Sequence, residues 1–234
     1  MTAVANAPCP FEYQVIRSKR KTAAIHVSAK GVQVRIPDYV SDEFAHDFVL
    51  KKARWVQTKL AAQAENNKLL PQLQLGEQLH WLGSPFPIVY SAGKKLKLIK
   101  DDQRFLVQGP KAPTQKQMMT LFSDYFKQQA KAYLVNETLK QAQRMNLAHK
   151  LGSVTFRRTK SKWGHCTSKG VIQYNWLIMG APEYVIQYLV VHEVAHLKYP
   201  HHQPNFWGLV ETYCRDYKKA NAWLKQQGIK LSWC

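Results

Sequence analysis

The segment VVHEVAHLKYPHHQPNFW, residues 190–207, carries four of the nine histidines of the chain beside one glutamate. His192 and His196 are four residues apart, so on a helix both imidazoles lie on one face and reach a single metal ion. Glu193 points to the side of that pair, where it can hold a water bound to the ion. This spacing indicates a hydrolytic zinc site.

A third protein ligand is still needed, because catalytic zinc usually takes three and leaves a fourth position open for water. His201 and His202 both follow the predicted helix. His202 lies six residues past His196, the interval at which H-E-x-x-H-x-x-G-x-x-H enzymes place their third histidine, although Tyr199 and Pro200 occupy the region of the usual glycine. His201 stays an alternative ligand, since it projects in another direction from the same turn.

Two other interpretations of the motif stay open. The histidines of a buried helix can serve only as hydrogen-bonded core residues, and a closed metal site can serve only to stabilise a fold. The helix itself is well marked: Pro182 and Glu183 suit a first turn, and Pro200 is expected to end it. A second helix is expected with Pro204 in its first turn.

The segment KSKWGHCTSKGVIQYNWLIMGAPEYVIQYLVVHEVAHL, residues 160–197, resembles the signature of the YgjP-like metallopeptidase family, and so does HQPNFW from His202. Residues 16–37, IRSKRKTAAIHVSAKGVQVRIP, are similar to the opening hairpin of that family. The resemblance implies a zincin-like metal-dependent hydrolase and assigns the third metal ligand to His202. Where the family usually has serine before the cysteine, this chain has His165.

The remaining pattern predicts an α+β fold in two parts. Residues 1–112 form a mostly β N-terminal region: a hairpin over 25–36, one long helix over about 42–63, a linker NNKLLPQLQLGE, and four short strands LHWLG, PFPIVY, KLKLI and RFLVQG. Residues 113–234 form the zincin-like catalytic domain, in which a helix from Thr114 to about Met145 leads to three strands. These strands are VTFRR, KSKWGHC and VIQYNWL, and they are expected to form a small sheet packed on the helix that carries His192 and His196. KSKWGHC is expected to be the edge strand, which can bind an extended peptide.

The formal net charge of +19, with 34 Lys and Arg against 15 Asp and Glu, predicts an anionic partner. Basic residues gather around the expected edge strand: Arg157, Arg158, Lys160, Lys162 and Lys169. Three functions are therefore compared. The first is a zinc peptidase acting on peptides or proteins, some of them held on nucleic acid. The second is a metal-dependent pyrophosphatase of nucleotides, an activity on uridine nucleotides that the resemblance also implies, and the third is a basic nucleic-acid-binding protein with a structural zinc.

The first function is favoured, with one zinc ion or another divalent metal per chain and Glu193 as general base. The expected substrate-binding residues are Arg158, Lys162, His165 and Tyr213, of which Arg158, His165 and Tyr213 are candidates for stabilising the oxyanion. No segment near Met1 resembles a signal peptide and no apolar run is long enough to cross a bilayer, so a cytoplasmic protein without a membrane partner is expected. The four cysteines show no C-x-x-C spacing, which argues against a disulfide framework.

Overall fold

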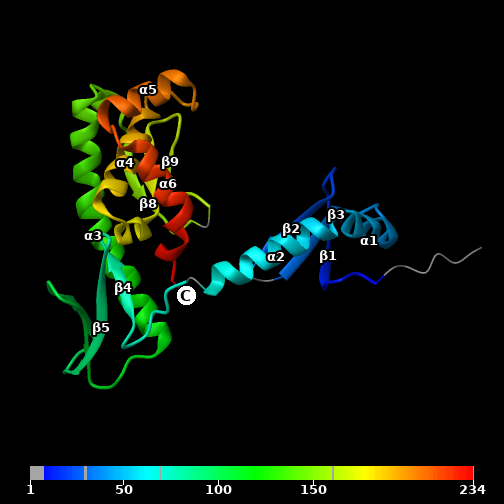
Figure 1. Ribbon diagram of the computed structural model, residues 1–234, viewed down its shortest axis with the longest axis horizontal. Coiled ribbons are helices and arrows are strands. Elements are labelled where there is room, and N and C mark those ends of the chain that lie inside the picture. Colours follow the sequence, from blue (N-terminus) through cyan, green and yellow to red (C-terminus); the bar gives the residue numbers. More distant parts are fainter. Residues whose placement is uncertain (1–7, 29–30, 69, 160, 234) are drawn as a thin grey trace, which may run out of the picture. The chain divides into compact units, whose positions relative to one another are not determined.

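The computed structural model describes residues 8–28, 31–68, 70–159 and 161–233 (Figure 1). Backbone contacts divide the chain into two compact units, residues 1–69 and 70–234. The division falls in the segment predicted as a linker. No helix within the described ranges is long and apolar enough to cross a membrane.

The first unit contains a three-stranded sheet in the order β1-β3-β2, from β1 (Tyr13–Ser18), β2 (Ala24–Ser28) and β3 (Gly31–Pro37). β2 and β3 are antiparallel with Ile25 opposite Val34, which confirms the predicted hairpin. Its turn residues Ala29 and Lys30 lie outside the described residues. The core of this unit is small and joins β3 to the following helix through Val34, Ile36, Ala45 and Val49.

The prediction of one helix over about 42–63 was wrong, because two helices occupy the segment: α1 (Asp42–Lys51) and α2 (Ala53–Lys68). Lys52 interrupts them with φ −110° and ψ 8°, and its N–H donates to the carbonyls of Leu50 and Val49. α1 packs against β3 whereas α2 packs against β2. The break at Lys52 therefore lets each helix follow a different strand.

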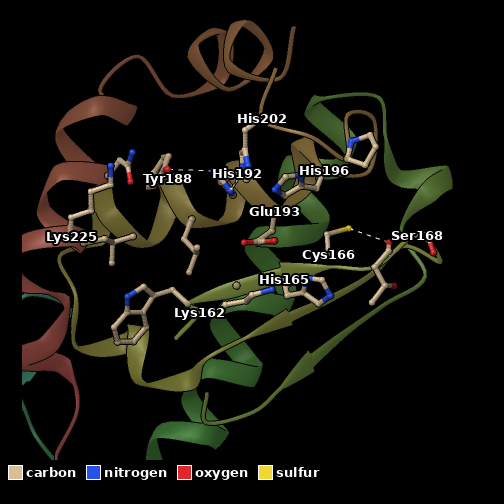
Figure 2. Close-up of a pocket in the computed structure, with 17 residues that line it drawn as sticks. Lys162, His165, Cys166, Ser168, Tyr188, His192, Glu193, His196, His202 and Lys225 are labelled. Atoms are coloured by element: carbon tan, nitrogen blue, oxygen red, sulfur yellow. Dashed lines mark hydrogen bonds between the residues drawn. The ribbon is translucent and has the colours of Figure 1, made fainter. Parts of the chain in front are cut away.

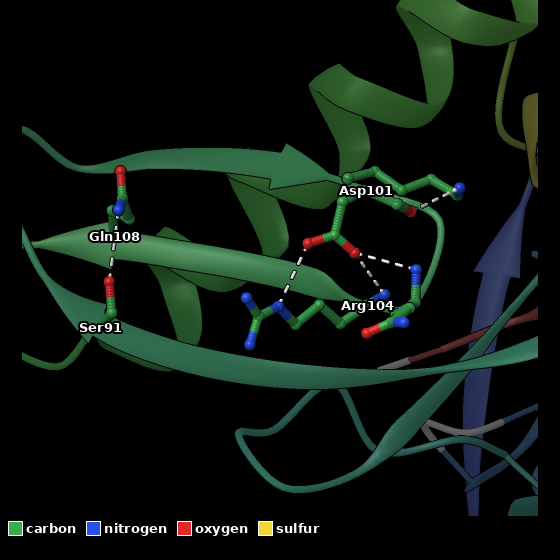
Figure 3. A network of polar contacts seen from close by, with 6 residues as sticks. Ser91, Asp101, Arg104 and Gln108 are labelled. Atoms are coloured by element: carbon green, nitrogen blue, oxygen red, sulfur yellow. Dashed lines mark hydrogen bonds and ion pairs between the residues drawn. The ribbon is translucent and has the colours of Figure 1, made fainter.

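The second unit begins with a four-stranded sheet, in the order β4-β5-β7-β6, which confirms the four predicted strands. They are β4 (Gln78–Trp81), β5 (Ser84–Ala92), β6 (Lys97–Lys100) and β7 (Phe105–Gly109). Asp101 forms the turn between β6 and β7: its Oδ1 accepts from the backbone N–H groups of Gln103 and Arg104, both at 2.9 Å (Figure 3). These bonds lower the pKa of Asp101. Gln108 donates to Ser91 Oγ at 3.3 Å between β7 and β5.

The predicted helix from Thr114 to Met145 is confirmed as α3 (Gln115–Arg144), with those two residues as its caps. Thr114 and Gln117 form a capping box, which supplies partners for backbone groups at the first turn. α3 packs against the four-stranded sheet of this unit, since the ring of Phe105 on β7 lies 5.2 Å from that of Phe122. The predicted domain boundary between residues 112 and 113 thus lies inside one continuous core, and it does not coincide with the division at 69 and 70.

A second sheet of order β8-β10-β9 follows, from β8 (Ser153–Phe156), β9 (Gly164–Cys166) and β10 (Val171–Tyr174). The chain then forms the 3-10 helix η2 (Trp176–Gly180) and three helices, α4 (Glu183–Ala195), α5 (Pro204–Tyr213) and α6 (Tyr217–Gln227). α4 contacts α3, β9, α5 and α6, so it is central to the unit (Figure 1). Separate small sheets among helices are consistent with the predicted α+β class.

Candidate metal centre

The helix α4 places a histidine and a glutamate in an apolar interior. Nine of its thirteen residues are buried, and Glu193 is among them with 3% of its surface exposed. The helix ends at Ala195 and not at Pro200, because the next turn tightens: Leu197 N–H donates to Val194 and Lys198 N–H to Ala195. His196 is the C-cap with φ −64° and ψ −19°, so it still lies one turn beyond His192.

The turn between α4 and α5 brings a third histidine to this pair. One ring nitrogen each of His192, His196 and His202 lies within 4.8 Å of the others. The Nε2 atoms of His202 and His192 are 3.1 Å apart (Figure 2). His201 is exposed and is not part of this group. The structure therefore brings together the three histidines that the spacing predicted, and leaves out the alternative.

Hydrogen bonds at the far side of two rings orient them toward the centre. His196 Nδ1 lies 3.0 Å from the carbonyl of Tyr199, which only accepts, so Nδ1 carries the proton and Nε2 keeps its lone pair. His192 Nδ1 lies 3.3 Å from the hydroxyl of Tyr188. The ring of Phe206 on α5 packs against all three imidazoles, with centroids 4.5 to 5.0 Å away. Such outer contacts fix the tautomer and the direction of metal-binding histidines.

The pKa shifts of the imidazoles agree with this arrangement. Burial, together with the neighbouring His196 and His202, lowers the pKa of His192 to about 3. Burial also lowers the pKa of His196, while its bond to Tyr199 acts in the opposite direction. Both rings are therefore neutral at pH 7, which is the form that binds metal ions.

Glu193, the next residue of α4 after His192, lines the same cavity as the three histidines. Burial raises the pKa of its carboxyl group to about 8, and the charge of Lys162 opposes that rise. Its Oε2 atom is buried without a hydrogen-bond partner. A buried carboxylate oxygen normally has a hydrogen-bond donor or a cation as its partner, so a water or an ion is expected beside Oε2.

The edge strand β9 explains why glycine stands at position 164. A Cβ atom built on Gly164 would lie 2.3 Å from Glu193 Oε1 and 2.5 Å from its Cδ, closer than any real contact. The backbone of β9 thus fits directly against the carboxylate. The glycine of the segment KSKWGHC therefore has a physical cause, because any side chain at position 164 would displace Glu193.

A cavity of about 620 Å³ opens over this centre, between β9, α4 and α6. Of the residues predicted to bind substrate, Lys162 and His165 line it (Figure 2). Arg158 and Tyr213 do not line it: Arg158 donates to the carbonyl of Trp233 at 2.6 Å, and the hydroxyl of Tyr213 donates to the carbonyl of Arg144 at 3.1 Å. The structure thus gives these two side chains other contacts, and Lys160 lies outside the described residues.

The sequence reasoning missed several residues of the site. Tyr188 precedes His192 by one helical turn, so the i, i+4 spacing contained a usable signal. Asn221, Leu224 and Lys225 line the cavity from α6, and Trp163 lines it beside β9. Nothing in the sequence marks the three residues of α6, because only tertiary packing brings that helix against α4.

A helix that carries a His-Glu pair, a second histidine one turn later and a third in the next turn defines the class of candidate metal-dependent hydrolases. The chain belongs to the YgjP-like metallopeptidase family, whose model, described as YgjP-like metallopeptidase domain, matches residues 21–227. Membership implies a divalent metal ion, and the three histidines offer ligands for it.

Comparison with other proteins adds little to this assignment. No curated protein matches the chain. Among solved structures, the chain is similar to one titled "Crystal structure of the metallopeptidase zymogen of Pyrococcus abyssi abylysin", with 20% identity and a TM-score of 0.35 over 40% of this chain and 95% of that one. A similarity of this extent carries no conclusion about activity.

Proposed function

We propose that this protein is a zinc-dependent peptidase in which His192, His196 and His202 hold the ion and Glu193 is the general base. One observation carries the proposal: three ring nitrogens converge within 4.8 Å beside a buried carboxylate oxygen that has no partner. A buried unpaired carboxylate oxygen costs free energy, and three converging ring nitrogens are a donor set that suits a metal cation. A cation and a water between these groups satisfy both.

The chemistry of the donors supports zinc as the ion. Imidazole nitrogen suits Zn²⁺, and three protein ligands with an open fourth position are the pattern of catalytic zinc sites. Among the described residues, the group of ligands at this point contains three members and no fourth. An open position argues against a metal that only stabilises the fold.

The ion, when bound, supplies Lewis acidity that polarises the carbonyl under attack and brings the pKa of the attacking water toward 7. Glu193 takes a proton from that water and later gives it to the leaving amine. Its Oε2 atom has no hydrogen-bond partner and lies beside the three histidines, so it is available to accept the proton. Gly164 keeps the carboxylate in place by leaving room for it.

The edge strand supports a peptide as the substrate. Trp163 O accepts from Asn175 N–H, and Thr167 N–H donates to Val171 O, so alternate residues of β9 bond to β10. The main-chain groups of Gly164 and Cys166 then point to the unpaired edge. An extended peptide can pair with them as an added strand next to Glu193. The description of the family as metallopeptidases agrees, whereas the comparisons lend no support to nucleotide or nucleic-acid substrates.

The variant Glu193→Gln tests the proposal, because it keeps the size of the side chain and removes the basic oxygen. Zinc-loaded protein and variant are incubated with casein, with a panel of quenched peptides and with nucleoside triphosphates. We expect cleavage of peptides by the parent and a loss of about 10²–10⁴-fold in the variant, with bound zinc and melting temperature retained. Equal turnover by both proteins, or turnover of the triphosphates alone, contradicts the proposed reaction.

A further inference from the structure

The cleft that holds the metal centre has lysines at both ends, and we infer from this that it selects acidic peptides. The inference rests on the proposed function, because it takes a peptide laid along β9 as the substrate. It adds that the peptide carries a negatively charged side chain on each side of the scissile bond. The argument starts from the groups that line the cleft.

The cavity over the metal centre contains Glu193 as its single carboxylate among the described residues. Its other charged side chains are Lys162, which follows the turn before β9, and Lys225, on α6. Lys162 lies beside the carboxylate of Glu193, and Lys225 lies at the far end of the cavity near Tyr188 (Figure 2). Lys225 therefore forms the first lysine end, whereas Lys162 lies at the centre beside Glu193.

A second cavity of about 490 Å³ adjoins the first, with which it shares Thr167, Ser168, His196 and Pro200. Lys150 and Lys169 line it, and no described acidic residue does. Ser168 and Lys225 lie on opposite sides of the histidines and Glu193 (Figure 2). The second lysine end thus lies beyond His196, away from the first.

The lysines at the two ends form no ion pairs with carboxylates of the described residues. The ion pairs there involve other side chains, and none includes Lys150, Lys169 or Lys225. The unit as a whole is basic: residues 70–234 carry 23 Lys and Arg against nine Asp and Glu. Unpaired charges of one sign in a cleft raise the local concentration of an oppositely charged ligand.

A short peptide paired with β9 extends past both ends of the strand. β9 covers Gly164–Cys166, which is roughly 10 Å at about 3.3 Å per residue. The residues beside it line the cavities: Trp163 lines the first, and Ser168 lines both. A peptide of six to eight residues along β9 therefore brings side chains to both ends, with the scissile bond between them.

The spread of the charges favours a peptide over a phosphate ligand. A polyphosphate concentrates its charge on adjacent groups, whereas the lysines of this cleft stand at two ends separated by the histidines. Two carboxylates several residues apart on an extended chain fit that separation. The experiment must therefore distinguish an acidic peptide from a nucleotide or a DNA strand as the preferred ligand.

The experiment uses four quenched octapeptides of one sequence, with Glu or Gln at one position on each side of the cleaved bond. We expect each glutamate to raise kcat/KM by about 2–5-fold over glutamine, the range for exposed charge pairs. Lys225→Gln should remove the advantage on one side only, and Lys169→Gln should remove it on the other. Lys162 is left unchanged, because its charge acts on Glu193. Lys219→Gln is the matched control, since Lys219 is on α6 over the ring of Tyr184, outside the cavity.

Binding to the Glu193→Gln protein separates this inference from the proposed reaction. Tighter binding of the acidic octapeptide than of its glutamine counterpart, weakened by Lys225→Gln and by added salt, supports the inference even if no peptide is cleaved. Equal binding of both peptides overturns it, and so does a preference for glutamate that survives both lysine variants. Binding of a nucleoside triphosphate or a DNA duplex that depends on Lys225, with no preference among the peptides, overturns it in favour of a phosphate ligand.

Discussion

The metal centre and the lysine ends of the cleft differ in how the protein holds them. At the centre, Glu193 and the imidazoles of His192 and His196 are oriented by burial, by bonds to Tyr188 and Tyr199, and by the ring of Phe206. At the ends, the lysine side chains are exposed and have no partners among the described carboxylates. Fixed groups suit a reaction that needs an accurate position, and mobile charges suit a preference among ligands. Changes at the centre should therefore have large effects, and changes outside it small ones.

The largest effect is expected from the ligands themselves. His202→Ala removes one of three ring nitrogens, so bound zinc should fall well below one ion per chain and peptide cleavage should be lost. Metal analysis after dialysis measures the first effect. His201→Ala is the control, because this exposed neighbour is not part of the three-histidine group and should keep full occupancy. Full zinc in the His202 variant would remove that residue from the site.

The next effect concerns the backbone that holds the general base. In Gly164→Ala, the new Cβ overlaps the Glu193 carboxylate, so either the side chain or β9 has to move. A displacement of about 1 Å at a reacting group costs about 10²-fold, so kcat should fall that far while zinc stays bound. Gly208→Ala on α5 is the control, since nothing lies within 4 Å of its Cβ and alanine favours a helix. A Gly164 variant with normal kcat would show that the carboxylate position is not critical.

A smaller effect is expected from Tyr188, which contacts the proposed ligand His192 and not the metal itself. Tyr188→Phe removes the hydroxyl beside His192 Nδ1 and keeps the ring that packs against the imidazole. Loss of such an outer partner typically weakens metal binding by about 10–100-fold. Competition with a zinc chelator measures this change, and unchanged affinity would mean that packing alone orients His192.

The sequence predicted the features that depend on nearby residues and missed those that depend on tertiary packing. The three histidines, the caps of α3 at Thr114 and Met145, and the helix start at Pro204 were predictable because each depends on residues within one or two turns. The break at Lys52 had no such signal, since neither proline nor glycine marks it and packing on two different strands causes it. Lys225 was missed for the same reason: only the folded chain brings α6 to the cleft.

Proximity in sequence was a weaker guide to the direction of a side chain. Arg158 lies next to the strands of the site and was predicted to bind substrate. Its guanidinium group instead donates to the carbonyl of Trp233, a buried residue near the end of the chain whose ring lies 4.7 Å from that of Phe126. This contact suggests that Arg158 holds the C-terminal segment on the core.

The smallest predicted effect follows from that contact. Arg158→Gln should lower the stability of the protein by about 1 kcal/mol, because one charged hydrogen bond at an exposed side chain is lost, and melting temperature should fall by about 2–4 °C. Arg157→Gln is the matched control, since Arg157 is exposed and only its backbone N–H is bonded, to Tyr174. Cleavage of the glutamate and glutamine octapeptides should be the same in both variants as in the parent. A rise in KM at unchanged melting temperature in the Arg158 variant would return this residue to the substrate-binding group, and would place a part of the cleft's charge preference outside its lysine ends.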